Sequence, residues 1–370
     1  MVIIKPKVAL CPAYNVYYHI KQMETGHGGN MKEAVVIRPR NLEFRQVEEP
    51  VPGPGQVMIR VKRIGVCGSD IHVWHGKHPF VTYPLVQGHE YSGVVEAVGA
   101  RVEGIALGDK VTATPQEVCG TCSPCRRGQY NACEVLKVRG FQAPGSARDL
   151  FVTEADKIVK LPTDFTFEEG AFVEPIAVAA HVTGRIGDLT GKNVVVSGAG
   201  TIGNFVAQAC LSRGAAKVLI TDISEYRLDV ARKVGLQCTC NVANDTLADA
   251  AKRVFGTDGF DVGVEVAGAE ASLTSLVKGI GKGGTLLIVG VYGDKPKVDM
   301  SVVCEHELTL KGSMMYRHED WVQAVKWIDS GAVKTEPLLT CHFPFERYAD
   351  AYRFIDAQGD KTMKVMIDVE

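Results

Sequence analysis

The chain has 370 residues, of which 46% are hydrophobic, and this length is enough for two folded domains of ordinary size. Its formal net charge is -2, so it lacks the basic excess that favours binding to nucleic acid or to an anionic membrane surface. It also has no apolar run near the roughly 20 residues that a membrane-spanning helix needs, and we expect neither nucleic acid nor a membrane as partner.

Residues 1–30 differ from the rest of the chain, because Pro6, Pro12 and Asn15 interrupt the apolar stretches and no cleavage-site pattern follows them. We therefore expect an N-terminal extension and no signal peptide, with Met31 as an alternative start of the native protein. The eleven cysteines are an odd number, and four of them fall between residues 119 and 133. This usage favours metal binding in a reducing compartment over disulfides, and it predicts a cytoplasmic protein.

The segment 31–184 alternates short apolar runs with Gly and Pro, as in 57–61 and 91–95, which is typical of a β-rich domain. From 185 to 312 the pattern changes to short strands separated by helix-length segments, which predicts parallel βαβ units in a doubly wound α/β sheet. Its strands are expected at 194–197, 218–221, 261–266, 285–289 and 308–311, and two of its helices at 204–212 and 247–255.

The remaining residues, 313–370, contain an amphipathic helix near 321–328 and end in an apolar run at 364–369. We predict that this last run is a strand that returns to the first domain. The first domain would then be discontinuous, with pieces at 31–184 and 313–370 on either side of a dinucleotide-binding domain at 185–312.

A glycine-rich turn directly follows the strand at 194–197 and opens a helix, as a dinucleotide site requires. Its residues are Gly198, Ala199, Gly200, Thr201, Ile202 and Gly203. The first two glycines allow a tight turn and close backbone approach, the third lets helix and strand pack together, and the N-terminus of the helix offers free N–H groups to a pyrophosphate.

Asp222 strengthens this prediction, because it ends the next strand, where a carboxylate can accept a hydrogen bond from a ribose 2′-hydroxyl. Its charge would repel a 2′-phosphate, which favours NAD over NADP. The alternative is a turn aspartate that caps the helix beginning near Ser224. Arg227 is a candidate to flank the adenosine, but a solvated helix arginine explains it equally well.

Cys119, Cys122, Cys125 and Cys133 form the pattern C-x2-C-x2-C-x7-C in a loop rich in Gly, Arg and Asn. Four closely spaced thiolates can surround zinc as a tetrahedron and leave no open position, so this pattern predicts a structural zinc site. The alternative is a set of four free or oxidised thiols.

A second set of metal-ligand residues is dispersed along the chain and comprises Cys67, His89, Glu90 and Glu174. A catalytic zinc takes about three protein ligands of these types and keeps one exchangeable position. Sequence spacing alone does not bring these residues together. Taken singly, His89 is explained by packing or surface exposure, and Glu174 as a surface carboxylate.

Together these motifs resemble the zinc-containing medium-chain alcohol dehydrogenase superfamily, in particular its sorbitol (L-iditol) dehydrogenase branch, over nearly all of residues 31–370. The resemblance rests on Gly88-His89-Glu90, the four cysteines, the run 169–175 and the glycine fingerprint, in the family's order. It implies a GroES-like catalytic domain beside a Rossmann domain. It also implies that Cys67, His89 and either Glu90 or Glu174 hold the catalytic zinc.

The resemblance assigns Ser69 and His72 to a proton relay, in which Ser69 takes the alcohol proton and passes it through the nicotinamide ribose to His72. The alternatives are a turn serine and a surface histidine. The zinc would stabilise the alkoxide while the substrate carbon gives hydride to NAD. Val266, Val289 and Val291 would lie along the nicotinamide half of the cofactor. Relatives of this kind form homodimers or homotetramers, and we expect the same here, with two zinc ions per chain.

The expected substrate is a small polyol that is oxidised to a ketose. Enzymes that act on L-threonine typically carry a histidine three residues before the first structural cysteine, where this chain has Gln116. Tyr316 and Arg317 resemble, in reversed order, a pair that approaches substrate hydroxyls in the polyol branch, and a guanidinium also suits a carboxylate. L-threonine, 2,3-butanediol and aldonates remain alternative substrates, and an NAD-binding structural or regulatory protein is the non-enzyme alternative.

Overall fold

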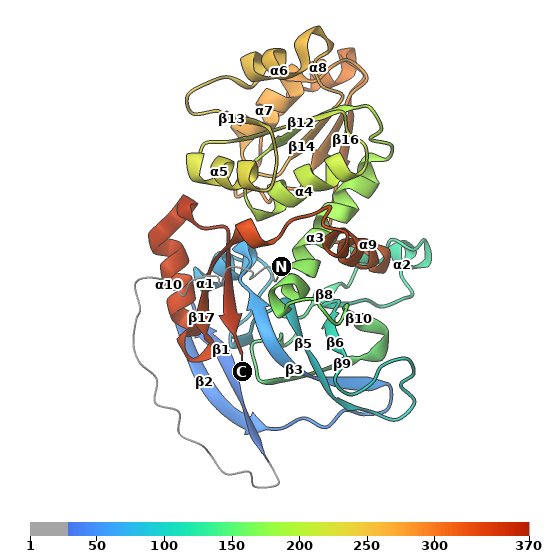
Figure 1. Cartoon of the computed structure of the whole chain (residues 1–370), viewed down its shortest axis with the longest axis vertical. Helices are drawn as coiled ribbons and strands as arrows, with labels where there is room; N and C mark the ends of the chain where they lie inside the picture. The colour runs from blue at the N-terminus through green and yellow to red at the C-terminus, as the bar shows by residue number, and fades with distance from the viewer. Residues whose placement is uncertain (1–28, 370) are drawn as a thin grey trace, which may run out of the picture.

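The computed structural model describes residues 29–369 and contains two large sheets of different construction, together with two smaller ones (Figure 1). One half of the molecule is built on a six-stranded parallel sheet, and the other on strands from both ends of the described chain. This arrangement confirms the predicted α/β class with a doubly wound parallel sheet beside a β-rich unit. Except for Gly29 and Asn30, the predicted N-terminal extension lies outside the described residues.

All strand pairs in the six-stranded sheet are parallel, in the order β13-β12-β11-β14-β15-β16. Val194, Val195 and Val196 of the central strand are fully buried, as expected for a strand covered by helices on both faces. The strands are β11 (Asn193–Ser197), β12 (Lys217–Asp222), β13 (Cys238–Asn241), β14 (Val262–Glu265), β15 (Thr285–Ile288) and β16 (Thr309–Gly312). The helices are α4 (Thr201–Ser212), α5 (Glu225–Lys233), α6 (Leu247–Phe255), α7 (Glu270–Gly279) and α8 (Met300–Glu305).

The sequence did not locate β13, whose residues Cys-Thr-Cys-Asn lack an apolar run. This short edge strand exists because its backbone pairs with the buried strand β12. The other five strands of the sheet overlap the predicted ranges, and α6 has the predicted bounds.

The second half is built on a seven-stranded sheet ordered β10-β6-β5-β3-β18-β17, with β9 also paired to β3. Its strands are β3 (Gln56–Gly65), β5 (Glu90–Val98), β6 (Lys110–Ala113), β9 (Leu150–Glu154), β10 (Ile158–Lys160), β17 (Leu339–Pro344) and β18 (Lys364–Asp368). A three-stranded sheet contains β1 (Asn30–Arg38), β2 (Asn41–Glu48) and β4 (Leu85–Val86), and a two-stranded one contains β7 (Gln116–Glu117) and β8 (Lys137–Val138). The helices are α1 (Gly68–Trp74), α2 (Ser123–Arg126), α9 (His318–Asp329) and α10 (Tyr348–Gln358).

The C-terminal strand β18 pairs antiparallel with β3, so the end of the chain joins a sheet formed largely by residues 56–160. In Figure 1 the red C-terminal elements accordingly lie against the blue strands. The boundaries at residues 184 and 312 stay predictions, and the helix α3 (Phe167–Ile186) runs through the first of them.

The helix α3 connects the two halves and is buried along most of its length (Figure 1). It begins at a capping box in which the Thr166 hydroxyl accepts from the Glu169 N–H and the Glu169 carboxylate accepts from the Thr166 N–H. Pro175 lies inside the helix, where it removes one backbone hydrogen bond. The helix persists because its apolar residues pack against both halves of the molecule. Within residues 29–369 no helix is both long and apolar enough to cross a membrane.

Candidate functional site

Cys67 lies at the point where β3 ends and the short helix α1 begins. It is the N-cap residue of α1, and its backbone N–H donates to the Asp70 carboxylate at 2.9 Å. The preceding residue, Val66, donates from its N–H to the carbonyl of Val365, which attaches the turn to β18. These contacts fix the backbone that carries the Cys67 sulfur.

The fold brings three of the four dispersed ligand candidates together. One ligand atom each from Cys67, His89 and Glu90 lies within 4.8 Å of the others, and His89 and Glu90 are buried. The His89 Nδ1 atom is buried without a hydrogen-bond partner. A thiolate, an imidazole and a carboxylate are zinc donors, and three of them leave one position open, so this group fits a catalytic zinc ion.

Two buried charges that the sequence analysis missed surround this group. Asp70 Oδ1 lies 3.7 Å from His89 Nδ1, and Lys364 Nζ donates to both oxygens of Glu90 at 2.8 and 2.5 Å. Burial alone would lower the pKa of His89, but the Asp70 carboxylate and the Cys67 sulfur raise it well above its usual value. Burial would likewise lower the pKa of Lys364, and Glu90 raises it. In the sequence, Lys364 could have been found because it is a charged residue in the largely apolar run 364–369.

Glu174, the fourth candidate, lies on α3 and is held by Tyr316, whose hydroxyl donates to Glu174 Oε1 at 2.6 Å. Both side chains are buried. Burial raises the pKa of Glu174 to about 7, and nearby Glu90 adds to this effect while His89 opposes it. Glu174 is therefore electrostatically coupled to the three-residue group but is not one of its three clustered ligand atoms.

The two candidate relay residues lie on α1, directly after Cys67. Ser69 is half-buried in the first turn and His72 is exposed in the last. Beside them, the His78 ring stacks on Phe141 at 4.9 Å, and Phe141 contacts the His89 ring at the same centroid distance. Burial, followed by the nearby His72 and His89, lowers the pKa of His78.

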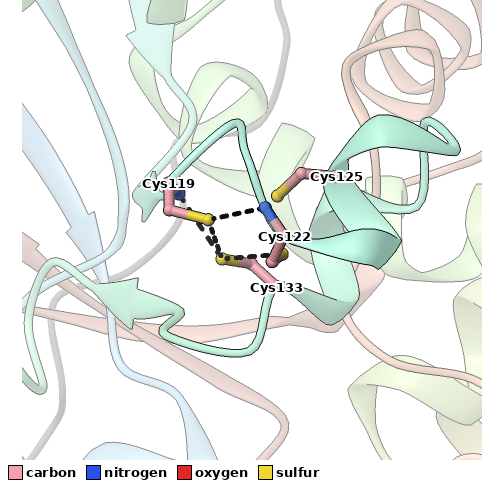
Figure 2. A group of neighbouring side chains, drawn as sticks. All are labelled: Cys119, Cys122, Cys125 and Cys133. Atoms are coloured by element: carbon pink, nitrogen blue, oxygen red, sulfur yellow. Dashed lines mark hydrogen bonds between the residues drawn. The ribbon is translucent and has the colours of Figure 1, made fainter.

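The four cysteines of the second predicted site converge in the segment 116–138, here called the four-cysteine segment (Figure 2). The Cys133 sulfur lies 3.6 Å from that of Cys119 and 3.9 Å from that of Cys122. A zinc tetrahedron with Zn–S bonds of about 2.3 Å has edges of about 3.8 Å, so these separations fit a metal and are too long for disulfides. Backbone N–H groups of Thr121 and Cys122 lower the pKa of Cys119 to about 6, which favours the thiolate.

A third group with ligand-type side chains contains Glu168, His342 and Asp368. The Arg63 guanidinium nitrogen Nε lies 2.6 Å from Glu168 Oε1 and 3.1 Å from Asp368 Oδ1. His342 Nδ1 lies 2.7 Å from the same Asp368 oxygen. Arg63 therefore pairs with both carboxylates, and the group is a network of ion pairs.

The glycine-rich turn has the close contacts that the fingerprint predicts. Gly198 has a φ of 112°, which favours glycine, and a Cβ atom on Gly203 would lie 1.8 Å from the Gly198 carbonyl oxygen. The turn is followed by α4, of which Gly200 is the N-cap residue and Thr201 and Ile202 form the start. The N-terminus of this helix can therefore bind a pyrophosphate closely.

Asp222 ends β12 and is tied to the glycine-rich turn. Its Oδ2 atom accepts from the Ala199 N–H at 2.7 Å and its Oδ1 atom from the Ser224 N–H at 2.9 Å. The alternative, that Asp222 caps the helix α5, holds only in that Asp222 binds the Ser224 N–H, because the N-cap residue of α5 is Ser224 itself. Arg227 Nη1 lies 3.9 Å from Asp222, so the pair sits together beside the turn.

The predicted nicotinamide contacts follow the ends of two neighbouring parallel strands. Val266 comes directly after β14, and Val289 and Val291 follow β15. Val291 is highly exposed and the other two are half-buried. Glu265, which no sequence motif indicated, is fully buried beside them. Its carboxylate accepts from the N–H groups of Ala267 and Gly268 at 3.0 Å and shapes the loop beside the glycine-rich turn.

The predicted substrate residues Tyr316 and Arg317 lie in different surroundings. Tyr316 is fully buried and contacts Glu174. Arg317 is half-buried and lines a cavity of about 430 Å³. The remaining lining residues are Gln129, Asn131, Ala132, His181, Arg185, Ile288, Gly312, Ser313 and Met314. None of the three clustered metal-ligand candidates lines this cavity. Gln116 is buried and donates from Nε2 to the Tyr316 carbonyl at 3.0 Å.

Comparison with known proteins gives two family models and close overall relatives. Residues 53–163 match the alcohol dehydrogenase GroES-like domain, and residues 201–330 match the zinc-binding dehydrogenase model. The chain is 35% identical to the L-threonine 3-dehydrogenase of Deinococcus deserti over 87% of this chain and 94% of that protein.

Two solved structures show the same fold over nearly the whole chain. An alcohol dehydrogenase of Escherichia coli CFT073 complexed with NADH has a TM-score of 0.86 and 29% identity, covering 92% of this chain and 100% of the other. The L-idonate 5-dehydrogenase of Escherichia coli K-12 has a TM-score of 0.82 and 27% identity, covering 92% and 98%.

Proposed function

Because this chain belongs to the zinc-dependent medium-chain alcohol dehydrogenases, we propose that it oxidises a secondary hydroxyl of a small polyol, such as sorbitol, L-iditol or xylitol, with NAD as hydride acceptor. The observation that carries this proposal is the convergence of half-buried Cys67 with the buried side chains of His89 and Glu90. The product would be a ketose, and the substrate carbon would lose one hydride and its hydroxyl one proton.

We assign the catalytic zinc to Cys67, His89 and Glu90, with Glu174 beside it, and a second, structural zinc to the four cysteines. A metal in the first site would supply Lewis-acid stabilisation of the developing alkoxide. Asp70 lies beside the His89 ring and Lys364 binds the Glu90 carboxylate, so these two charges would orient the proposed metal ligands. Ser69 and His72, which follow Cys67 on α1, would carry the substrate proton toward solvent.

The choice of NAD over NADP rests on Asp222. Its carboxylate is fixed by the Ala199 and Ser224 N–H groups at the mouth of the glycine-rich turn, where it would meet the adenosine ribose. Each carboxylate oxygen keeps a further lone pair for a ribose hydroxyl, and the negative charge disfavours a 2′-phosphate. Val266, Val289 and Val291 would border the nicotinamide half.

L-threonine is the second candidate substrate, because the chain is 35% identical to a protein named for that activity. Against it stands Gln116, whose side-chain amide is buried and engaged with the Tyr316 backbone. The Arg317 guanidinium suits vicinal hydroxyls or a carboxylate, which keeps aldonates and 2,3-butanediol as further candidates.

The decisive experiment measures NADH formation from sorbitol, xylitol, L-iditol, 2,3-butanediol, L-threonine and aldonates, with NADP as a parallel acceptor. We expect the highest kcat/KM with a polyol and NAD. Activity with L-threonine alone would contradict the polyol assignment. Metal analysis of the same preparation distinguishes an NAD-binding structural protein, for which fewer than two zinc ions per chain and no turnover are expected.

We also propose that the protein forms a homodimer or homotetramer. The strand β16 ends the parallel sheet, and Leu310 on it is exposed. Such an unpaired edge favours pairing with another copy of the chain. Light scattering coupled to size exclusion tests this, and a mass of 40.0 kDa would contradict it.

A further inference from the structure

Residues 314–320, here called the 314–320 segment, follow β16, include the first residues of α9 and carry Tyr316. The Tyr316 hydroxyl holds Glu174 at 2.6 Å, and its ring packs edge to face against Trp321 at a centroid distance of 5.1 Å. Tyr316 and Trp321 are fully buried. The position of Glu174 beside the proposed catalytic metal thus depends on where this segment lies.

Three residues of the four-cysteine segment bind the 314–320 segment, mostly through its backbone. Gln116 Nε2 donates to the Tyr316 carbonyl at 3.0 Å, and Asn131 Nδ2 donates to the Met314 carbonyl at 2.8 Å. The Tyr130 hydroxyl accepts from the His318 N–H at 2.6 Å. Figure 1 shows α2, within the four-cysteine segment, beside α9. The backbone on both sides of Tyr316 is therefore fixed from the four-cysteine segment.

A buried histidine connects this contact to α3, the helix that carries Glu174. His181 Nδ1 lies 2.8 Å from Asp320 Oδ2, and His181 Nε2 lies 3.3 Å from Asn131 Nδ2. The same Asp320 oxygen accepts from the Arg317 N–H at 2.7 Å and so closes the first turn of α9. His181, Asn131 and Asp320 are all buried, which makes an unpaired partner in this chain costly.

We propose that Asn131 and His181 are positioning residues for the catalytic centre, and that the four-cysteine segment acts through them to hold Tyr316 on Glu174. Only the expected effect on kcat rests on the proposed dehydrogenase function; the structural role of the two residues does not. Asn131 lies two residues before Cys133, so a metal that fixes the four cysteines would also fix the Asn131 amide. The four-cysteine segment would then support alignment at a distance, in addition to stability.

The first test is a double-mutant cycle between Asn131→Ala and Tyr316→Phe, measured as kcat and KM. Asn131→Ala should lower kcat about 10-fold with a smaller change in KM, because roughly one net hydrogen bond of alignment is lost. In the Tyr316→Phe background the same change should lower kcat less than about 2-fold, since the contact it supports is already absent. Equal effects in both backgrounds would overturn the proposal.

The second test is hydrogen–deuterium exchange, which needs no substrate. Asn131→Ala should speed exchange of the amides in residues 314–320 and leave β11 and β12 unchanged. Tyr130→Phe removes a single oxygen and should speed exchange less in the same residues. This milder variant keeps the proposal testable if Asn131→Ala folds poorly. Arg127→Ala is the matched control, because the side-chain partner of Arg127 is Ser123 within the four-cysteine segment.

The two tests separate the possible failures. Unchanged exchange at residues 314–320 in both Asn131→Ala and Tyr130→Phe would overturn the positioning role, whatever the enzyme does. If the parent protein oxidises none of the alcohols, the proposed function fails, and exchange alone decides whether the four-cysteine segment holds Tyr316. His181→Asn should reproduce the exchange effect through Asp320, and its absence would remove His181 from the proposal.

Discussion

The two predicted metal centres are assembled in opposite ways. The four cysteines lie within one segment of the chain, and three of them are outside the buried core. Cys67, His89 and Glu90 come from the ends of β3 and β5, and their supporting residues Lys364 and Tyr316 come from the far end of the chain. The first centre needs only local chain geometry, whereas the second needs the whole fold.

This difference teaches where each centre is vulnerable. A local site loses its metal when one ligand is lost, and with the metal it loses the folding free energy that the metal supplies. A dispersed site also depends on buried charges that touch no metal, because an unpaired buried charge destabilises the fold around it. Changes in the two centres should therefore separate metal content, catalysis and stability.

The largest effect on activity is expected from replacing one cysteine of the dispersed centre, with a cysteine of the local centre replaced for comparison. Cys67→Ser should lower kcat/KM about 1,000-fold or more, since several kcal/mol of Lewis-acid stabilisation are lost, while the melting temperature changes little. Cys119→Ser should lower the melting temperature and reduce kcat no more than about 10-fold. Each variant should lose one zinc ion by metal analysis. Full activity in Cys67→Ser would remove the proposed catalytic metal site.

Lys364→Met tests the buried charges of the dispersed centre. It leaves the Glu90 carboxylate buried without its partner, so the free energy of unfolding should fall by about 3–5 kcal/mol in urea denaturation. Adding Glu90→Gln should restore part of this loss. The exposed Lys361→Met is the control and should change stability by less than about 0.5 kcal/mol. A Lys364→Met variant as stable as the control would show that the ion pair does not stabilise the centre.

Asp222→Asn extends the comparison to the cofactor site, where a local glycine turn and a distant strand end meet. Loss of the charge should lower the ratio of kcat/KM with NAD to that with NADP by about 10- to 100-fold, as expected for a hydrogen bond to a charged group. Asp229→Asn, on the exposed surface of α5, should leave the ratio unchanged. An unchanged ratio in Asp222→Asn would mean that Asp222 holds the glycine-rich turn and does not select the cofactor.

The smallest effect is expected at the local start of α3. Thr166→Ala removes the side-chain acceptor of the capping box and should cost about 1 kcal/mol of unfolding free energy. Glu174 should keep its place, because tertiary packing holds the helix, so kcat/KM should match that of the exposed control Thr163→Ala. A fall in kcat/KM as large as that in Cys67→Ser would mean that the local cap, more than packing, positions Glu174.

Patterns that are short in sequence predicted much of the molecule. The glycine fingerprint, five of the six parallel strands and the four-cysteine cluster all appear where expected, because each depends on residues a few positions apart. The edge strand β13 was missed, since its polar sequence forms a strand only beside β12. Gln116 was interpreted as a marker of substrate type, and in the structure its side chain holds the Tyr316 backbone.

The sequence by itself determined the α/β class, the glycine-rich turn and the donor types of the two predicted metal centres, because hydrophobic periodicity and local spacing encode them. Only the tertiary structure decided that Glu90 joins Cys67 and His89 while Glu174 pairs with Tyr316. It also decided that Lys364 neutralises Glu90 across 274 positions of sequence. Such pairs are set by which strands and helices meet in the folded core, and no local pattern records that meeting.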